Sequence, residues 1–206
     1  MCFLSKNKLW IIGAGVLIIS LFYFYVDNNT NNTNKDFLVK IFSTFKSDNP
    51  AFPFTFEYPQ DEWVLLETSG RREIYDEVYL RGKPDSGGEF APSISIFVRP
   101  NEMRKPAEEL LSNQLRMEEG LPEFEILKRE KVSIDKQKVS LVTFRHKAWV
   151  PLGATDGRMV EIKVRMLFFI NGEKSYQIVT RTAAEQAVQI FEVFNHILKT
   201  FKFIDR

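Results

Sequence analysis

The stretch VEIKVRMLFFING, residues 160–172, decides the fold of this chain. Its apolar and charged residues alternate at first, a period of two that is typical of a β-strand. Leu167 and Phe169 then place apolar residues on the second face, so we expect both faces of this strand to be covered. Asn171-Gly172 is a strong hairpin signal. It predicts an antiparallel partner strand over Ser175–Thr182.

More strands are predicted upstream of this hairpin, because short apolar or alternating runs are separated by turn residues. They are Phe54–Tyr58, Trp63–Leu66, Glu73–Leu80, Ser93–Val98, Phe124–Ile134 and Val139–Val150.

Two segments have helical spacing. Pro106–Glu119 begins with a proline and two glutamates, which suit a first helical turn, and Gly120 follows it. Ala183–Thr200 is the predicted last helix. The apolar residues expected on their inner sides are Leu110, Leu111, Leu115 and Met117 in the first helix, and Val188, Phe191, Phe194, Ile197 and Leu198 in the second.

The two ends of the domain also carry signals. Lys35–Lys46 has apolar residues four positions apart, which predicts a helix or a lead-in segment that packs on the domain. Phe201 and Phe203, after the last helix, predict a short closing strand. The order of elements is strands, a helix, hairpin-linked strands and a helix. We therefore expect an α+β fold, an antiparallel sheet flanked by helices on both faces.

The N-terminal segment predicts a membrane anchor. Leu9–Val26 has no charge and is just long enough to cross a hydrocarbon core. Lysines precede it, so residues 1–8 are expected in the cytoplasm and the rest outside. A cleaved signal peptide is the rival interpretation, but the end of the run has no small-residue cleavage site. Residues 27–36 predict a flexible tether, and 37–206 an extracytoplasmic domain.

Composition excludes some functions. The formal net charge is +1, so the chain has no electrostatic footprint for nucleic acid. Cys2 is the only cysteine, which excludes an intramolecular disulfide and Cys-x-x-Cys motifs. We expect no cofactor and no bound metal, since neither phosphate-binding nor regular calcium-loop spacing is present.

Two short elements support a family resemblance. Residues 54–59, FTFEYP, with Trp63 after them, resemble the F-x-Y-P…W element that opens PsbP-like domains. The Asn171-Gly172 hairpin, with the terminal helix and residues 201–203 (FKF), is similar to the C-terminal half of that family. The resemblance covers about Phe52–Ile204. It implies an α/β/α sandwich and an accessory or binding module, often exported, rather than an enzyme. The matching residues are core and turn positions, so no functional residue is implied.

Catalytic candidates are few. His146 stands between two cations, which disfavour the imidazolium and tune a general base. The alternative is that His146 is an ordinary strand residue whose imidazole is hydrogen-bonded. His196 lies near the end of the last helix, where it meets the helix dipole favourably. Glu118, Glu119, Glu123 and Glu125 form an acidic cluster, which is typical of solvated surface charge. We expect no catalytic residue.

One connection is unusual. Trp149, Pro151 and Leu152 place apolar bulk between two predicted strands, where polar turn residues are expected. These residues either pack back on a helix or form an exposed anchor for a partner. The sequence thus favours a membrane-anchored, non-catalytic binding or assembly module. The alternatives are a hydrolase or metal-dependent enzyme that uses His146 with nearby carboxylates, and a structural domain needed for envelope integrity.

Overall fold

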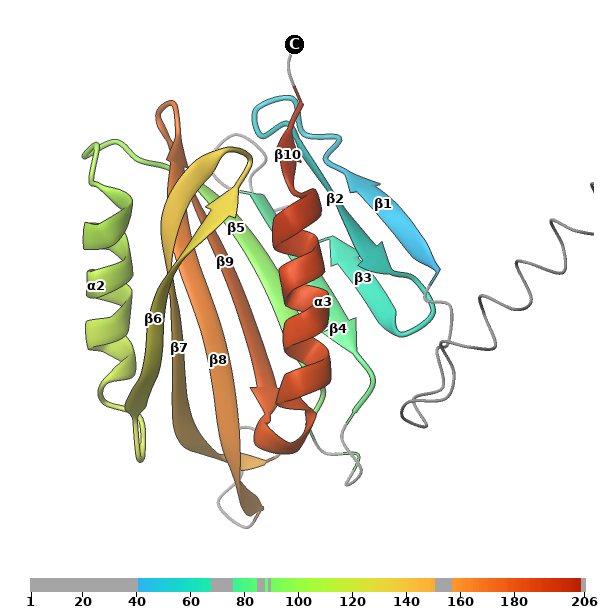
Figure 1. The fold of residues 1–206 in the computed structure, drawn as a ribbon, viewed down its shortest axis with the longest axis vertical. Helices are drawn as coiled ribbons and strands as arrows, with labels where there is room; N and C mark the ends of the chain where they lie inside the picture. The colour runs from blue at the N-terminus through green and yellow to red at the C-terminus, as the bar shows by residue number, and fades with distance from the viewer. Residues whose placement is uncertain (1–40, 68–75, 85–87, 89, 151–156, 205–206) are drawn as a thin grey trace, which may run out of the picture. The chain divides into compact units, whose positions relative to one another are not determined.

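The computed structural model describes residues 41–67, 76–84, 88, 90–150 and 157–204 (Figure 1). The predicted anchor Leu9–Val26 and the tether 27–36 lie outside these residues. Within the described ranges, no helix combines the length and the apolar character that a membrane span requires.

A seven-stranded antiparallel sheet forms the centre of the domain, in the order β3-β4-β5-β9-β8-β7-β6. The strands are β3 (Trp63–Glu67), β4 (Asp76–Gly82), β5 (Ser93–Pro100), β6 (Glu125–Ile134), β7 (Gln137–Val150), β8 (Arg158–Asn171) and β9 (Lys174–Ala183). The β8–β9 hairpin is confirmed, with its turn one residue later than predicted. Gly172 has φ 59° at the first central position of that turn, and Asn171 pairs with Lys174.

A second, three-stranded sheet contains β1 (Phe42–Lys46), β2 (Phe54–Pro59) and β10 (Lys202–Phe203), in the order β1-β2-β10. The closing strand is therefore confirmed. Of the two possibilities for Lys35–Lys46, a helix or a lead-in segment that packs on the domain, the helix is wrong where it is described, because residues 42–46 pair antiparallel with β2. Phe45 is buried against Phe54 and Phe56, and this pairing outweighs the local helical spacing.

The two long helices cover opposite faces of the large sheet (Figure 1), as predicted. Helix α2 (Ala107–Glu118) packs Leu111 and Leu115 on one face. Helix α3 (Ala187–Thr200) follows a short 3₁₀ turn, η1 (Ala184–Gln186), and packs on the other face with the three-stranded sheet. The expected α+β architecture is thus confirmed for the described residues.

Two residues assigned to inner helix sides are instead exposed, Met117 by 68% and Val188 by 75%. Each is two residues from a buried position of its helix, Leu115 and Ile190. Two residues turn the side chain by about 200°, which places it on the solvent side.

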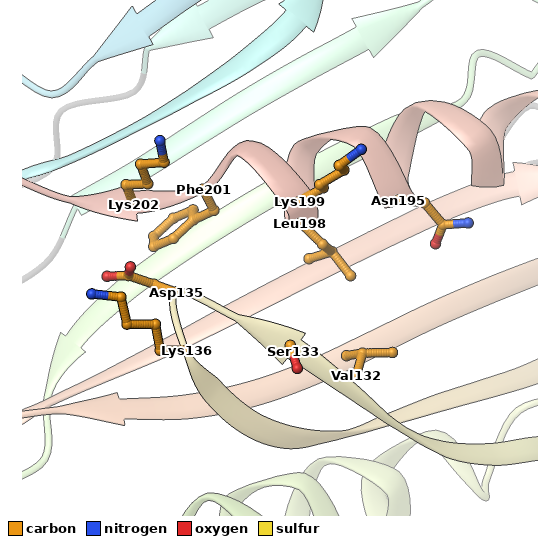
Figure 2. Close-up of a pocket in the computed structure, with 9 residues that line it drawn as sticks. All are labelled: Val132, Ser133, Asp135, Lys136, Asn195, Leu198, Lys199, Phe201 and Lys202. Carbon is orange, nitrogen blue, oxygen red and sulfur yellow. The ribbon is translucent and has the colours of Figure 1, made fainter.

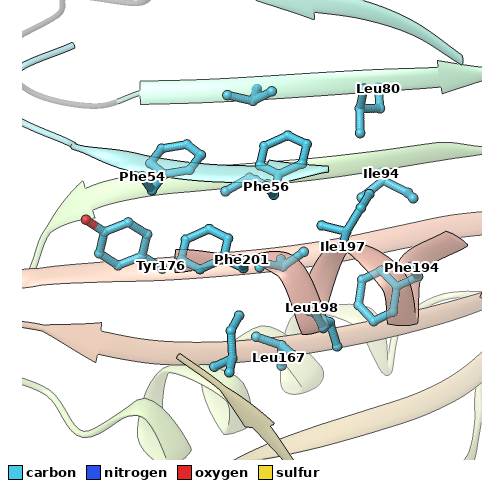
Figure 3. Packing of buried hydrophobic residues seen from close by; sticks show 14 of the residues in the cluster. Phe54, Phe56, Leu80, Ile94, Leu167, Tyr176, Phe194, Ile197, Leu198 and Phe201 are labelled. Atoms are coloured by element: carbon cyan, nitrogen blue, oxygen red, sulfur yellow. The ribbon is translucent and has the colours of Figure 1, made fainter. Parts of the chain in front are cut away.

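Aromatic side chains fill the space between α3, the large sheet and the small sheet (Figure 3). Phe54 from β2 has its ring centroid 5.3 Å from that of Phe201 and 6.2 Å from that of Tyr176. Phe169 and Tyr176, neighbours across β8 and β9, stack at 5.0 Å. The FTFEYP element is therefore a core strand, consistent with its structural part in the resemblance.

Candidate functional site

A cleft of about 510 Å³ lies between the β6–β7 hairpin and the C-terminal end of α3 (Figure 2). This volume is within the range of small-ligand and side-chain pockets. Its apolar surface comes from Val132, Leu198 and Phe201, and polar groups surround that surface. The complete lining is Val132, Ser133, Asp135, Lys136, Asn195, Leu198, Lys199, Phe201 and Lys202.

The hairpin wall of the cleft is set by a two-residue turn. Asp135 and Lys136 have φ of 41° and 68°, and Ile134 pairs with Gln137 across the turn. Positive φ at both central residues is the type I′ geometry that suits the twist of two flanking strands. The turn therefore presents Asp135 and Lys136 at the end of the sheet, facing α3 and β10.

A hydrogen bond fixes this hairpin to the opposite wall. The backbone N–H of Phe203 in β10 donates to Oδ2 of Asp135 at 3.1 Å. The rings of Phe203 and Phe201 lie edge to face, 5.5 Å apart, and Phe201 is buried. The two walls are thus connected at one end, so the cleft is a preformed feature of the fold.

Three lysines surround the cleft. Lys136 is on the hairpin, Lys199 is in the last turn of α3 and Lys202 begins β10. All three side chains are exposed, and none makes an ion pair with a residue that the structure describes. Since unpaired ammonium groups on both walls raise the local concentration of anions, the site suits an acidic partner with apolar side chains.

Beside the cleft, Asn195 is held by a partly buried cation. Its Oδ1 accepts a hydrogen bond from Arg165 of β8 at 2.9 Å. The guanidinium of Arg165 also lies 4.4 Å from the centre of the Phe191 ring. Burial lowers the pKa of Arg165, although Glu130 opposes this effect. The group remains charged at neutral pH, because an arginine guanidinium keeps its proton in proteins.

His146 is on β7, on the sheet face that α2 covers, whereas the cleft is on the α3 side. It is buried, at 7% exposure, beside Phe144 as expected. Burial lowers its pKa, while the backbone carbonyl of Lys147 and the charge of Glu118 act in the opposite direction and Arg181 adds a smaller lowering. The flanking cations have little part, because Arg145 and Lys147 pair with glutamates. A neutral imidazole results, enclosed under a helix and separated from the cleft.

His196 has a more specific partner than the helix dipole. Its Nε2 lies 3.0 Å from Oε2 of Glu57 on β2, and its ring stacks on Phe42 of β1 with centroids 4.0 Å apart. These contacts connect α3 to both strands of the small sheet. The role supported by this geometry is structural.

The acidic cluster is divided among cations. Glu118 lies 3.6 Å from Arg181, Glu123 pairs with Lys147 and Glu125 with Arg145. Across the described ranges, no three His, Cys, Asp or Glu side chains come together as a metal site. Among the described residues, these carboxylates therefore do not come together on one ion, although the charge of Glu118 acts on His146.

Trp149 is part of β7, one residue before the strand's last residue, and 44% of it is exposed. Its cross-strand partner Met159 is 43% exposed, so the two form a small apolar pair on the surface. Pro151 and Leu152 lie outside the described residues. Of the two possibilities for Trp149, packing against a helix or exposure, the structure thus has the exposed one.

The cleft residues were not among the predicted site residues. The available signal was the group of lysines at the Asp135-Lys136 turn and around Phe201, two segments more than sixty positions apart in the chain. The pairing of β10 with β2, the packing of α3 against β6 and the hydrogen bond from Phe203 to Asp135 bring them together.

Comparison with known proteins gives structural relatives only. No protein-family model matches the chain, and no curated protein is similar to it in sequence. Among solved structures, LpqN, involved in cell envelope biogenesis of Mycobacterium tuberculosis, has TM-score 0.53 and 13% identity, over 85% of this chain and 99% of LpqN. PsbP from Synechocystis has TM-score 0.49 and 14% identity, over 84% and 99%. The Saccharomyces cerevisiae Ran-binding protein Mog1p has TM-score 0.49 and 14% identity, over 81% and 97%.

At these identities a structural match concerns the fold. The chain shares the fold of LpqN, and a PsbP is among the solved structures that it resembles.

Proposed function

We propose that this protein is a membrane-anchored, extracytoplasmic binding or assembly module without catalytic activity, and that its partner binds in the cleft between the β6–β7 hairpin and α3. The observation that carries this proposal is the cleft itself. Its apolar surface of Val132, Leu198 and Phe201 is bordered by three lysines that have no ionic partner in the described chain. Apolar contact supplies affinity there, and the cations supply specificity for an acidic partner.

A binding role also fits the placement of the polar groups. An enzyme requires an acid, a base or a nucleophile converging on one pocket. The buried His146 is on the opposite face of the sheet, and the cleft's carboxylate, Asp135, accepts a backbone hydrogen bond. Exposed Trp149 with Met159 is a second possible contact surface.

The location rests on the N-terminal sequence. Leu9–Val26 would anchor the chain, and the lysines before it would keep residues 1–8 in the cytoplasm. LpqN is involved in cell envelope biogenesis, and an exported domain of the same fold suits an envelope role here as well. Protease added outside intact spheroplasts should then digest the domain. Full protection until lysis would reverse the proposed orientation.

Site-specific crosslinking of the full-length chain in its native membrane tests the binding site. A photoreactive p-benzoylphenylalanine replaces one residue at a time: Lys199 in the cleft, Val188 on the same helix, or Trp149 on β7. We expect a discrete adduct from Lys199 and none from Val188, which is 75% exposed but does not line the cleft. The matched helix positions separate specific contact from random collision.

A blocking variant completes this experiment. With the photoreactive group at Lys136, Lys199→Trp should remove the adduct because the indole fills the cleft, whereas Val188→Trp should leave it. An adduct that forms from Trp149 and from neither cleft position would move the binding site to the Trp149–Met159 pair.

A further inference from the structure

Strand β6 is a free edge beside the cleft. Among the strands that the structure describes, it is the last of the seven-stranded sheet, and β7 is its only neighbour in the strand order. Val132 and Ser133, near its end, line the cleft. An unpaired edge offers backbone N–H and C=O groups to a further strand.

The turn geometry identifies which backbone groups are free. In a two-residue hairpin the flanking residues, here Ile134 and Gln137, form a hydrogen-bonded pair, and the pattern alternates along the strands. The backbone groups of Ile134, Val132 and Glu130 therefore face β7. Those of Ser133, Lys131 and Arg129 face outward. A register irregularity between Ile126 and Lys128 ends this regular edge.

The two faces of this edge differ in chemistry. On the α3 side, the cleft presents Val132, Leu198 and Phe201. On the α2 side, Lys131 reaches Glu108 of α2 at 2.7 Å, so Arg129, two residues earlier, shares that face. Arg129 makes no ion pair in the described chain. On the α3 side an added strand would meet the apolar surface of the cleft, with its lysines around it and Glu130 beside Arg165. On the α2 side it would meet Arg129 and Lys131.

We infer that the occupant of the site is an extended segment of a partner protein, with alternating apolar and acidic residues, that adds to β6 as an antiparallel strand. Its apolar side chains enter the cleft, and its acidic side chains meet Arg129, with Lys131, the ion-pair partner of Glu108, beside it. This inference rests on the proposed function. The antiparallel direction follows the rest of the fold, in which every described strand pair is antiparallel. A second copy of this edge is disfavoured, because its residues on that face, Arg129, Lys131 and Ser133, bring no acidic side chain to Arg129.

Acetylated peptides in which glutamate and valine alternate test the pairing, with full-length protein in detergent. In an antiparallel ladder, the peptide residues opposite Ser133, Lys131 and Arg129 exchange both backbone hydrogen bonds with β6. In the bound peptide these residues are the glutamates, because residues directly opposite each other place their side chains on the same face as Lys131 and Arg129. N-methylation of one central glutamate removes an N–H donor and places a methyl group between the two strands. It should therefore weaken binding by about tenfold, as expected for the loss of one backbone hydrogen bond. N-methylation of the adjacent valine should have little effect, since that amide faces away from β6.

A protein variant tests the same edge from the other side. Ser133→Pro removes an outward N–H and leaves the ladder to β7 intact, a place where edge strands accept proline. It should weaken binding of the alternating peptide, whereas Ser133→Ala, which keeps the N–H, should not. If the proline variant does not fold, the N-methylation pattern decides alone.

Other outcomes separate this inference from the proposed function. The peptide could bind in a way that Lys199→Trp abolishes but that neither N-methyl position affects. This result overturns strand addition and leaves the cleft as the proposed binding site. Absence of peptide binding, with a Lys199 adduct still formed in the membrane, overturns the segment chemistry and again keeps the cleft. Binding to vesicles with anionic phosphatidylglycerol in place of the peptide overturns the inference, because the partner is then a lipid surface.

Discussion

Phe54→Ala is expected to destabilise the domain by about 3–5 kcal/mol, the cost of truncating a large core aromatic side chain. Phe54 is fully buried, and its ring contacts Phe45, Phe56, Tyr176 and Phe201. These partners come from both sheets and from the end of α3. Truncation therefore leaves a cavity where the three layers meet. Denaturant unfolding of the soluble fragment 36–206 measures the loss.

Phe42→Ala is the matched control for Phe54→Ala. Phe42 is also a phenylalanine of the small sheet, but 39% of it is exposed and its ring stacks on that of His196. We expect a cost well below that of Phe54→Ala, since less apolar surface leaves a buried environment. Equal losses for the two variants would contradict the position of β2 at the centre of the core.

Leu115→Ala should cost about 2–5 kcal/mol, the range for a large aliphatic residue in a packed core. Leu115 is 2% exposed and belongs to a cluster with Phe144, Val164 and Met166 on the α2 face of the large sheet. That cluster is separate from the aromatic core. The effects of Phe54→Ala and Leu115→Ala should therefore add, because the sites share no contact.

Met117→Ala, on the same helix, is the control for Leu115→Ala. Met117 is 68% exposed, so its truncation should change the unfolding free energy by no more than about 0.5 kcal/mol. A large cost for Met117 with a small one for Leu115 would mean that α2 presents its other side to the sheet, as an apolar stripe through Met117 would require.

Most of the large sheet was predictable, because its strands carry their own period and are joined by local turns. The alternation from Val160 and the Asn171-Gly172 signal depend only on neighbouring residues. Pairings between distant segments were not predictable. The adjacency of β5 and β9 joins residues about eighty positions apart, and no local pattern encodes such a partner.

The N-terminal strand illustrates a local pattern that tertiary contacts override. The apolar spacing in Lys35–Lys46 satisfies a helix template, yet residues 42–46 form β1. Strand β2 pairs with β10 along one edge, and its other edge is available to β1. In that position Phe45 is buried against Phe54 and Phe56. A helix there would lose both the ladder and that burial.

The candidate site, too, has some features that the sequence predicts and others that only the tertiary structure decides. From the sequence alone came the rarity of catalytic groups and the apolar bulk at Trp149. The tertiary structure decided that Trp149 is exposed at the end of β7, and it paired each of Glu118, Glu123 and Glu125 with a cation. Exposure and ion pairing depend on what lies across the sheet, which residue order along one strand does not specify.

The sequence by itself determined the α+β class, the antiparallel hairpins and the two long helices, because each depends on residues close together in the chain. The near-neutral charge and the single cysteine are read directly from the composition. Only the tertiary structure decided the second sheet, the cleft and the free edge of β6. The cleft exists because the Asp135-Lys136 turn and the end of α3, remote in sequence, meet through Asp135 and Phe203. Such a meeting is selected by the packing of the whole core rather than by either segment.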